Sequence, residues 1–256
     1  MINYCMTKIR LHQFLSKTGE FSSKKEILNA VKNSEIIVDN KVITNQHHQL
    51  SKGKNVYYRN KLLKINEKIY LILNKPEGYL SSRLTNNDLR LNKKSLFSLI
   101  KLNNKLEKSL STIGRLDESS SGLIILTNDG DLIHQIAHPK FEISKTYFVE
   151  LENELFKDDK LNIEKGIIID LEENGIINKY KTKPSKMECI NKNQLYITIS
   201  EGKKREIRRI FESIGNKVLK LKRIKIGNLN LEELNINEGK FKIVDKKFLL
   251  EKIKLL

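Results

Sequence analysis

Apolar positions predict two short helices and a hairpin in the first part of the chain. They recur at helical spacing over residues 9–15 and again over residues 27–31. A turn at Thr18-Gly19 separates the two stretches, and Ser22-Ser23 stands where a helix N-cap is expected. Beyond them, Asp39-Asn40 lies between two short apolar runs and predicts a tight hairpin.

From about residue 68 onward, the pattern is dominated by strands. One short helix is predicted near 96–100, and a longer one runs from about Lys203 to Ile214, where Gly215 ends it. Because few helices separate the strands, we predict an α+β fold. It comprises a small domain over 8–66, then a mixed, largely antiparallel sheet domain flanked by helices over 68–256. The predicted strands are 69–73, 123–127, 146–151, 167–171 and 195–200.

The net charge of the chain indicates a polyanionic partner. The chain of 256 residues has 48 Lys and Arg against 31 Asp and Glu, a net charge of +17. Residues 1–66 carry 12 of the basic and 4 of the acidic residues, so this region is the more basic per residue. There is no apolar run of about 18 residues, which excludes a membrane-spanning helix.

Cysteine usage and the first residues point to a reducing compartment. Cys5 and Cys189 are too few for a disulfide framework, so both are interpreted as ordinary thiols. The stretch Met1 to Met6 lacks the apolar core of a signal peptide. We therefore expect a cytoplasmic protein.

The small basic region resembles the S4 RNA-binding domain. The stretch Asn33-Ser34-Glu35 departs from that family, which commonly has a glycine there. The resemblance implies that Arg10, Lys24 and Lys25 hold an RNA stem. It rests on the residues Arg10-Leu11, Phe14-Leu15, Ser23-Lys24-Lys25 and Val38-Asp39-Asn40-Lys41-Val42.

The most informative stretch surrounds an aspartate in a loop. Gly114 and the segment 119–122 bracket this loop, and the apolar run 123–126 follows it as a buried strand. Asp117 is thus anchored close to the core, which suits a side chain that must be held in one geometry. Read alone, Asp117 could equally be a carboxylate that caps its own loop.

The wider pattern resembles the rRNA pseudouridine synthases of the RsuA/RluB group. That group has a Gly-Arg-Leu-Asp motif, a Ser/Thr-rich turn, an apolar strand and Thr-Asn-Asp-Gly, as residues 114–130 do here. The resemblance covers nearly the entire chain. Further blocks that agree are Asn74-Lys75-Pro76-Glu77-Gly78, His138-Pro139-Lys140, Lys145-Thr146-Tyr147, Glu201 to Arg209, and Val218 to Arg223.

This resemblance implies a role for each of four residues. Asp117 is the catalytic carboxylate, acting without metal or coenzyme either as a nucleophile on the sugar or as a base. Arg208 is its cationic partner, although a solvated charge on a basic helix is the plainer alternative. Tyr147 packs against the target base, or else is an ordinary core tyrosine. Arg115 fills the space left by the everted nucleotide, since the glycosidic bond is unreachable in a stacked helix.

A run of basic residues next to this loop is interpreted as an RNA-backbone groove. Lys203, Lys204, Arg205 and Arg209 contribute to it, and Lys75 is assigned the same RNA-binding role. The histidine pairs His47-His48 and His134/His138 lack companions at ligand spacing, so no metal site is predicted.

We therefore predict a cofactor-free enzyme, expected to be monomeric, that isomerises uridine to pseudouridine in rRNA. The Arg205-Glu206 pair favours the large-subunit branch, since the small-subunit type tends to have His-Gln there. The alternative is a non-catalytic RNA-binding ribosome assembly factor. A DNA-binding regulator is disfavoured because no helix-turn-helix pattern is found.

Overall fold

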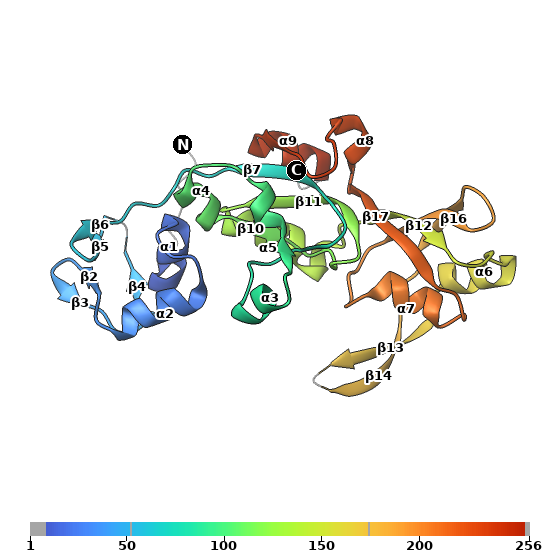
Figure 1. Ribbon diagram of the computed structural model, residues 1–256, viewed down its shortest axis with the longest axis horizontal. Coiled ribbons are helices and arrows are strands. Elements are labelled where there is room, and N and C mark those ends of the chain that lie inside the picture. Colours follow the sequence, from blue (N-terminus) through green and yellow to red (C-terminus); the bar gives the residue numbers. More distant parts are fainter. Residues whose placement is uncertain (1–8, 52, 174, 254–256) are drawn as a thin grey trace. The chain divides into compact units, whose positions relative to one another are not determined.

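The computed structural model describes residues 9–51, 53–173 and 175–253, so Cys5, the Met1 to Met6 stretch and position 8 lie outside it. The chain divides into two compact units (Figure 1). The first comprises the residues up to 68 together with 101–111, and the second comprises 69–100 and 112–256. The sequence placed 101–111 in the second domain, whereas their contacts assign them to the first unit.

The first unit has its own apolar core. Leu11, Leu15, Ile27 and Val31 bury the inner faces of two helices against strands. The helix that belongs to 101–111 is tied to the same unit, because Lys105 pairs with Glu20 at 3.0 Å. The elements are β1 (Ile9–Arg10), α1 (Leu11–Thr18), α2 (Lys24–Lys32), β2 (Ile36–Val38), β3 (Lys41–Val42), β4 (Gln49–Leu50), β5 (Val56–Tyr58), β6 (Lys61–Leu62) and α4 (Asn104–Ser109).

Local signals place the turns of this unit as predicted. Gly19 ends α1 with a φ of 66°, and the Ser23 hydroxyl caps α2 by accepting from the Glu26 amide at 3.1 Å. Asp39 and Asn40 have φ values of 45° and 65°, as a tight hairpin turn between β2 and β3 requires. Ser34 has a φ of 60°, a conformation natural for the glycine that S4 domains commonly have in this stretch.

The second unit is built on one sheet, with strands in the order β15-β16-β12-β17-β11-β7-β19. β11 and β17 are parallel, and the other pairs along this order are antiparallel, which confirms a mixed, largely antiparallel sheet. The strands are β7 (Tyr70–Lys75), β10 (Ser111–Ile113), β11 (Ser121–Thr127), β12 (Lys145–Leu151), β15 (Lys186–Cys189), β16 (Gln194–Ile199), β17 (Val218–Ile226), β18 (Leu229–Asn230) and β19 (Phe241–Val244).

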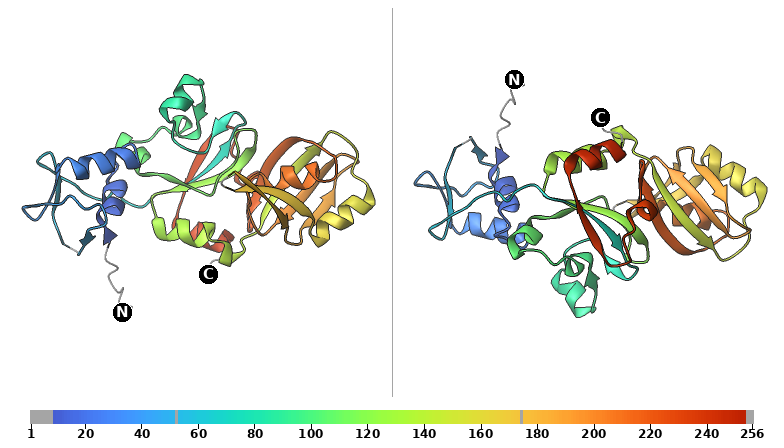
Figure 2. Two further views of the ribbon diagram at one scale, coloured as in Figure 1. Left: turned by 90° about the horizontal axis from the view of Figure 1, so that it is seen from below. Right: turned by 90° about the horizontal axis from the view of Figure 1, so that it is seen from above.

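Helices cover one face of the sheet where β7 and β11 run together. Leu132 of α5 (Gly130–Ala137) and Leu249 of α9 (Lys246–Ile253) share a buried cluster with Ile72 and Leu123. The two helices lie side by side in both views of Figure 2. Tight packing here leaves β11 as the rigid support for the loop that precedes it.

The other helices and strands of the second unit are shorter or more peripheral. Within the described residues, no helix is long and apolar enough to cross a membrane. The helix predicted near 96–100 is a 3-10 turn. These elements are β8 (Tyr79–Leu80), α3 (Asn86–Arg90), β9 (Lys94–Ser95), η1 (Leu96–Leu99), η2 (Pro139–Phe141), α6 (Lys157–Lys165), the hairpin β13 (Ile168–Glu173) and β14 (Ile176–Lys181), α7 (Glu206–Glu212) and α8 (Leu231–Leu234).

The helix predicted from Lys203 begins three residues later, at Glu206. The backbone of Arg205 is left-handed, with a φ of 55°, so the chain cannot be helical through it. The Glu206 carboxylate accepts a hydrogen bond from the Lys203 amide at 2.7 Å, which holds the preceding residues as a loop. The basic residues 203–205 therefore project from a loop rather than from a helix face.

Candidate active site

The loop that carries Asp117 connects β10 to β11, and each of its carbonyl oxygens from Leu116 to Ser120 accepts a hydrogen bond. The Ser81 hydroxyl donates to Leu116 at 2.7 Å, and the Gly78 amide donates to Glu118 at 2.8 Å. The Asp117 carbonyl accepts from the Ser120 amide at 3.1 Å. Such complete pairing fixes the backbone on either side of Asp117.

Lys75, at the end of β7, donates three hydrogen bonds, two to the Asp117 loop and one to the residue that follows Lys75 itself. Its ammonium group donates to the carbonyl oxygens of Pro76 at 2.9 Å, Asp117 at 3.2 Å and Ser120 at 2.7 Å. The side chain is fully buried, with 0% exposure. Burial lowers the pKa of Lys75 to about 8, against an opposing effect of the nearby Glu77 and Asp117 carboxylates.

The predicted RNA contact by Lys75 is contradicted by this burial. An ammonium group with all three donors bonded to main-chain oxygens has none left for a phosphate. Lys75 instead positions the Asp117 loop. A fully buried lysine is rare, and only the tertiary packing shows that this one lies inside.

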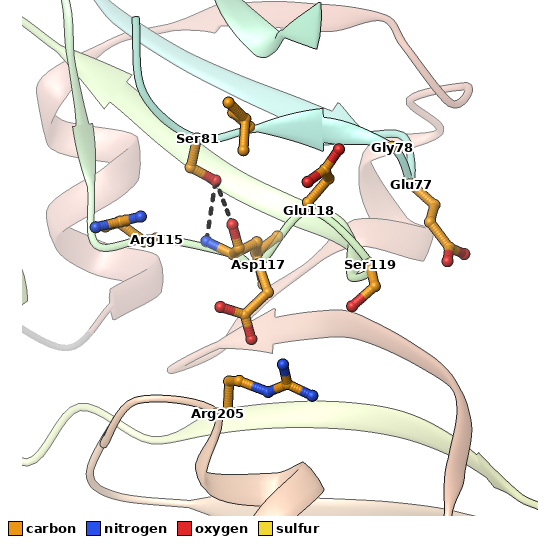
Figure 3. Close-up of a pocket in the computed structure, with 10 residues that line it drawn as sticks. Glu77, Gly78, Ser81, Arg115, Asp117, Glu118, Ser119 and Arg205 are labelled. Carbon is orange, nitrogen blue, oxygen red and sulfur yellow. Dashed lines mark hydrogen bonds between the residues drawn. The ribbon is translucent and has the colours of Figure 1, made fainter. Parts of the chain in front are cut away.

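The Asp117 side chain is exposed and opens into a pocket of about 490 Å³. Asp117 and the guanidinium group of Arg205 approach the same space from two different segments (Figure 3). Arg115 also lines the pocket. The other lining residues are Glu77, Gly78, Leu80, Ser81, Leu116, Glu118 and Ser119.

Arg208 lies near this loop but does not form the close ion pair that the sequence predicts. It is 9% exposed, and its guanidinium group donates to the carbonyl oxygens of Val218 at 2.8 Å and Ser119 at 2.7 Å. Burial and, secondarily, Arg205 lower the pKa of Arg208, whereas the Asp117 carboxylate acts to raise it. The two groups therefore interact through space, while Arg208 holds the loop through its main chain.

Tyr147 is buried on β12, in a cross-strand row of residues that ends next to the Asp117 loop. It pairs with Arg223 of β17, and Arg223 pairs with Gly122 of β11 directly after the loop. Adjacent strands are about 4.8 Å apart, so Tyr147 lies roughly 10 Å from Gly122 along this row. The side chain shares a buried face with Val149 and Leu151, as predicted, but is not among the residues that line the pocket.

Gly122 permits the close approach of β11 and β17 in this row. A Cβ at that position would lie 2.2 Å from the carbonyl oxygen of Arg223, and the φ of Gly122 is 103°. Arg223 is itself buried, and its Nε donates to the Leu123 carbonyl oxygen at 2.7 Å. The junction therefore couples the strand of Tyr147 to the loop of Asp117.

The other residues that the sequence assigns to RNA binding do not line the pocket. Lys203 stacks its ammonium group 4.6 Å from the ring of Tyr180, and Lys204 lies 4.0 Å from the Glu172 carboxylate. Arg209 donates to the carbonyl oxygen of Asp170 in the β13–β14 hairpin. On the first unit, the predicted RNA-binding residues Arg10, Lys24 and Lys25 are all exposed.

Two carboxyl groups, the buried Glu206 and the half-buried Glu201, flank the loop of residues 203–205. Burial, assisted by the charge of Glu201, raises the pKa of Glu206 to about 8. Burial also acts to raise the pKa of Glu201, but hydrogen bonds from the Tyr180 hydroxyl at 2.5 Å and the Lys183 amide at 2.8 Å lower it overall. Burial thus keeps the Glu206 carboxyl group protonated near neutral pH, because its pKa is raised to about 8, while the pKa of Glu201 is lowered.

Several residues of the site escaped the sequence interpretation. Ser81 both donates to Leu116 and accepts from its amide at 3.0 Å, yet it lies in a polar stretch without a pattern. Glu118 lines the pocket and pairs with Lys93 at 2.7 Å. Glu77 and Gly78 belong to the Asn74–Gly78 block, whose agreement with the synthases was a usable signal.

Comparisons with known proteins show which proteins this chain is similar to. The family model described as RNA pseudouridylate synthase matches residues 69–213. Ribosomal small subunit pseudouridine synthase A of Haemophilus influenzae is 31% identical over 91% of this chain and 95% of the relative. Ribosomal large subunit pseudouridine synthase B of Bacillus subtilis is 30% identical over 90% and 91%. A crystal structure of a pseudouridylate synthase superimposes with a TM-score of 0.66, at 30% identity over 96% of this chain and 99% of that one.

The chain therefore belongs to the RNA pseudouridylate synthase family. It is an isomerase that converts uridine in RNA to pseudouridine. The resemblance found in the sequence is confirmed, and the pocket beside Asp117 lies within the residues that the family model matches.

Proposed function

We propose that the substrate is ribosomal RNA, with the modified uridine in the large subunit. The relatives named for the small and the large subunit are almost equally similar to this chain. Support for the large subunit comes from the Arg205-Glu206 pair, which resembles that branch.

Asp117 is the catalytic carboxylate in this proposal. The observation that carries it is the exposed Asp117 side chain in a pocket, on a loop whose backbone is bonded at every carbonyl from 116 to 120. A carboxylate held in this way can meet the sugar of an everted uridine with little reorganisation. It acts as a nucleophile on the sugar or as a base, and both roles use the same ionised group.

Arg208 and Tyr147 support that carboxylate in different ways. Arg208 contributes positive potential and fixes the loop through Ser119. Tyr147 contacts the uracil when the everted nucleotide enters between the loop and β12, in the row that passes through Arg223. No cofactor takes part, and the protein works as a cytoplasmic monomer.

The first unit is an S4-like RNA-binding domain in this proposal. Its positive charge and the exposure of Arg10, Lys24 and Lys25 support a role in holding a stem next to the target. The exposed basic residues Lys203, Lys204 and Arg205 extend the contact on the second unit, together with the half-buried Arg209.

The test is incubation of the full-length protein with large- and small-subunit rRNA transcripts, followed by chemical mapping of pseudouridine. We expect modification of a large-subunit transcript, and its loss in Asp117→Asn with RNA binding retained. Normal activity in Asp117→Asn would overturn the catalytic assignment. Modification confined to the small-subunit transcript would overturn the subunit assignment. Tight binding without modification of any transcript would favour a ribosome assembly factor.

A further inference from the structure

Most of the positive charge around Asp117 is bound to the protein itself. The Lys75 ammonium group and the two terminal nitrogens of Arg208 are bonded to main-chain oxygens. Both side chains are also buried. They provide positive potential, but neither is able to turn towards a ligand in the pocket without breaking the bonds that hold the loop.

Arg205 differs from them in every one of these respects. It is exposed, lines the pocket, and comes from the segment facing the Asp117 loop (Figure 3). Its ion pair with Glu212 is long, at 4.0 Å, and more than half of the Arg205 side chain is exposed, at 53%. Such a pair is weak, so the guanidinium group is available to a ligand.

The backbone of Arg205 is held in a conformation that arginine rarely adopts. Its φ of 55° and ψ of 29° are left-handed, which costs a residue with a Cβ roughly 1 kcal/mol relative to glycine. The conformation is imposed by the Glu206–Lys203 bond on one side and by the Arg209 amide, which bonds to the Arg205 carbonyl at 3.0 Å, on the other. Strain of this kind is concentrated at functional sites.

The pocket is lined by several carboxylates, and their negative charge gives an arginine there a role in binding RNA. Glu77, Asp117 and Glu118 all line it, and of these three carboxylates Lys93 pairs with Glu118. An RNA phosphate that approaches Asp117 therefore meets repulsion from carboxylates. A guanidinium group offsets that repulsion and binds a phosphate through two parallel hydrogen bonds.

We propose that Arg205 binds the phosphodiester next to the everted uridine and so positions its sugar over Asp117. This inference rests on the proposed function and makes Arg205 a substrate-positioning residue. Arg115, by resemblance, occupies the space that the nucleotide leaves, which assigns the phosphate to Arg205. The ligand is the backbone phosphate, common to all sequences, so Arg205 contributes affinity and orientation rather than base choice.

The test compares kcat/KM at several salt concentrations for full-length wild-type, Arg205→Gln and Arg205→Lys proteins on the mapped transcript. Losing one charged hydrogen-bonding group lowers kcat/KM by roughly 10- to 100-fold at low salt, mainly through KM. The slope of log kcat/KM against log salt becomes shallower by about 0.7 to 0.9, the value for one phosphate contact. Arg205→Lys keeps the slope because it keeps the charge. An unchanged slope in Arg205→Gln would overturn the inference.

Two further variants separate the side chain from the backbone and from general charge. Arg205→Gly relieves the left-handed backbone, so it should behave like Arg205→Gln if the guanidinium group matters. Recovery of wild-type activity in Arg205→Gly would show that only the backbone matters, and would refute the phosphate contact. Arg90→Gln removes an exposed arginine of the same unit that does not line the pocket, and it should leave activity and slope unchanged.

Failure of the inference is distinguishable from failure of the proposed function. The dependence of affinity on salt can also be measured without turnover. Equilibrium binding of the transcript is compared between Asp117→Asn and the double variant Asp117→Asn with Arg205→Gln. A wild-type protein that modifies no rRNA transcript would refute the proposed function, and the binding slopes would still decide whether Arg205 contacts a phosphate. An active enzyme with identical slopes for both binding variants would refute the inference alone.

Discussion

The ammonium group of Lys75 donates a hydrogen bond to the main-chain carbonyl oxygen of Asp117 over 3.2 Å. The buried ammonium group thus contacts the backbone of Asp117, the proposed catalytic residue. The Asp117 carboxylate itself remains open to the pocket. Ser120 receives a second bond from the same nitrogen at 2.7 Å. The strand β7 therefore determines where the loop after β10 lies.

Replacing Lys75 by methionine should destabilise the loop and remove most activity. The side chain keeps a similar length but leaves the carbonyls of Asp117 and Ser120 with fewer donors in a buried place. Unsatisfied buried groups cost about 1–3 kcal/mol each, so we expect the free energy of unfolding to fall by about 2–4 kcal/mol. Urea denaturation and pseudouridine formation measure the two effects.

Lys93→Met is the control for this substitution. It removes the ion pair with Glu118, whose two side chains are 33% and 35% exposed, and should cost about 1 kcal/mol or less. Equal losses in the two variants would mean that burial of the Lys75 ammonium group has no special importance for the loop.

Substituting Arg208 with lysine should lower kcat while RNA binding changes little. The guanidinium group bridges the carbonyls of Val218 and Ser119, and a single ammonium group does not span both. The charge remains, but the loop loses one of its ties, so we expect roughly a 10- to 100-fold fall in kcat. Single-turnover kinetics and RNA binding separate the two effects. A fall in RNA affinity with an unchanged kcat would instead assign Arg208 to RNA binding.

Adding a methyl group at Gly122 should disrupt the junction of β11 and β17. The new Cβ in Gly122→Ala would lie 2.2 Å from the carbonyl oxygen of Arg223, in a strand that cannot move without separating the sheet. We expect a loss of about 3 kcal/mol or more in the free energy of unfolding, because both overpacking and a positive φ act here.

Gly114→Ala provides a matched comparison within the same motif. Gly114 also has a positive φ, 71°, but a Cβ there meets nothing within 4 Å. Only the backbone strain applies, so the cost should be about 1 kcal/mol. If both variants lost the same stability, the close approach at Gly122 would have no energetic consequence.

Local sequence signals predicted those elements whose cause is local. The Asp39-Asn40 turn, the Ser23 cap and the alternating burial of Tyr147, Val149 and Leu151 all follow from the residues themselves. The exposed strand Ile176–Lys181 was missed because neither of its faces is consistently buried, so it carries no alternation. It is identified as a strand only by its pairing with β13 in the folded protein.

The sequence pointed to part of the pocket lining but not to the contacts that hold it. Asp117 and Arg115 line one pocket, as the motif implies. The burial of Lys75 and the bonds of Arg208 to Val218 and Ser119 depend on segments far apart in the chain, which no spacing rule reaches. The start of α7 was misplaced because the left-handed backbone of Arg205 and the bond from the Lys203 amide to Glu206 keep residues 203–205 in a loop, which the spacing of apolar residues does not reveal.

The carboxyl pair itself leads to a pH dependence of stability. Glu206 faces Glu201 and the Lys203 amide, with Lys145 nearby on β12, while Tyr180 and Lys183 bond to Glu201. The pKa of Glu206 rises from 4.5 to about 8 on folding, so the folded state binds a proton more tightly than the unfolded state. Its contribution is fully present below pH 4.5 and is lost as the pH rises through about 8.

Glu206→Gln should therefore stabilise the protein at alkaline pH and flatten its pH profile. The amide still accepts from the Lys203 amide and donates to Glu201, but it does not ionise. Between pH 6 and pH 9 the melting temperature of wild type should fall relative to the variant by about 3–10 °C, or about 1–3 kcal/mol. Glu201 has a lowered pKa and titrates below this window, so it does not produce the same trend. Glu172→Gln, at an exposed carboxylate, should follow wild type at each pH. Parallel melting profiles for wild type and Glu206→Gln would mean that folding does not raise the pKa of Glu206.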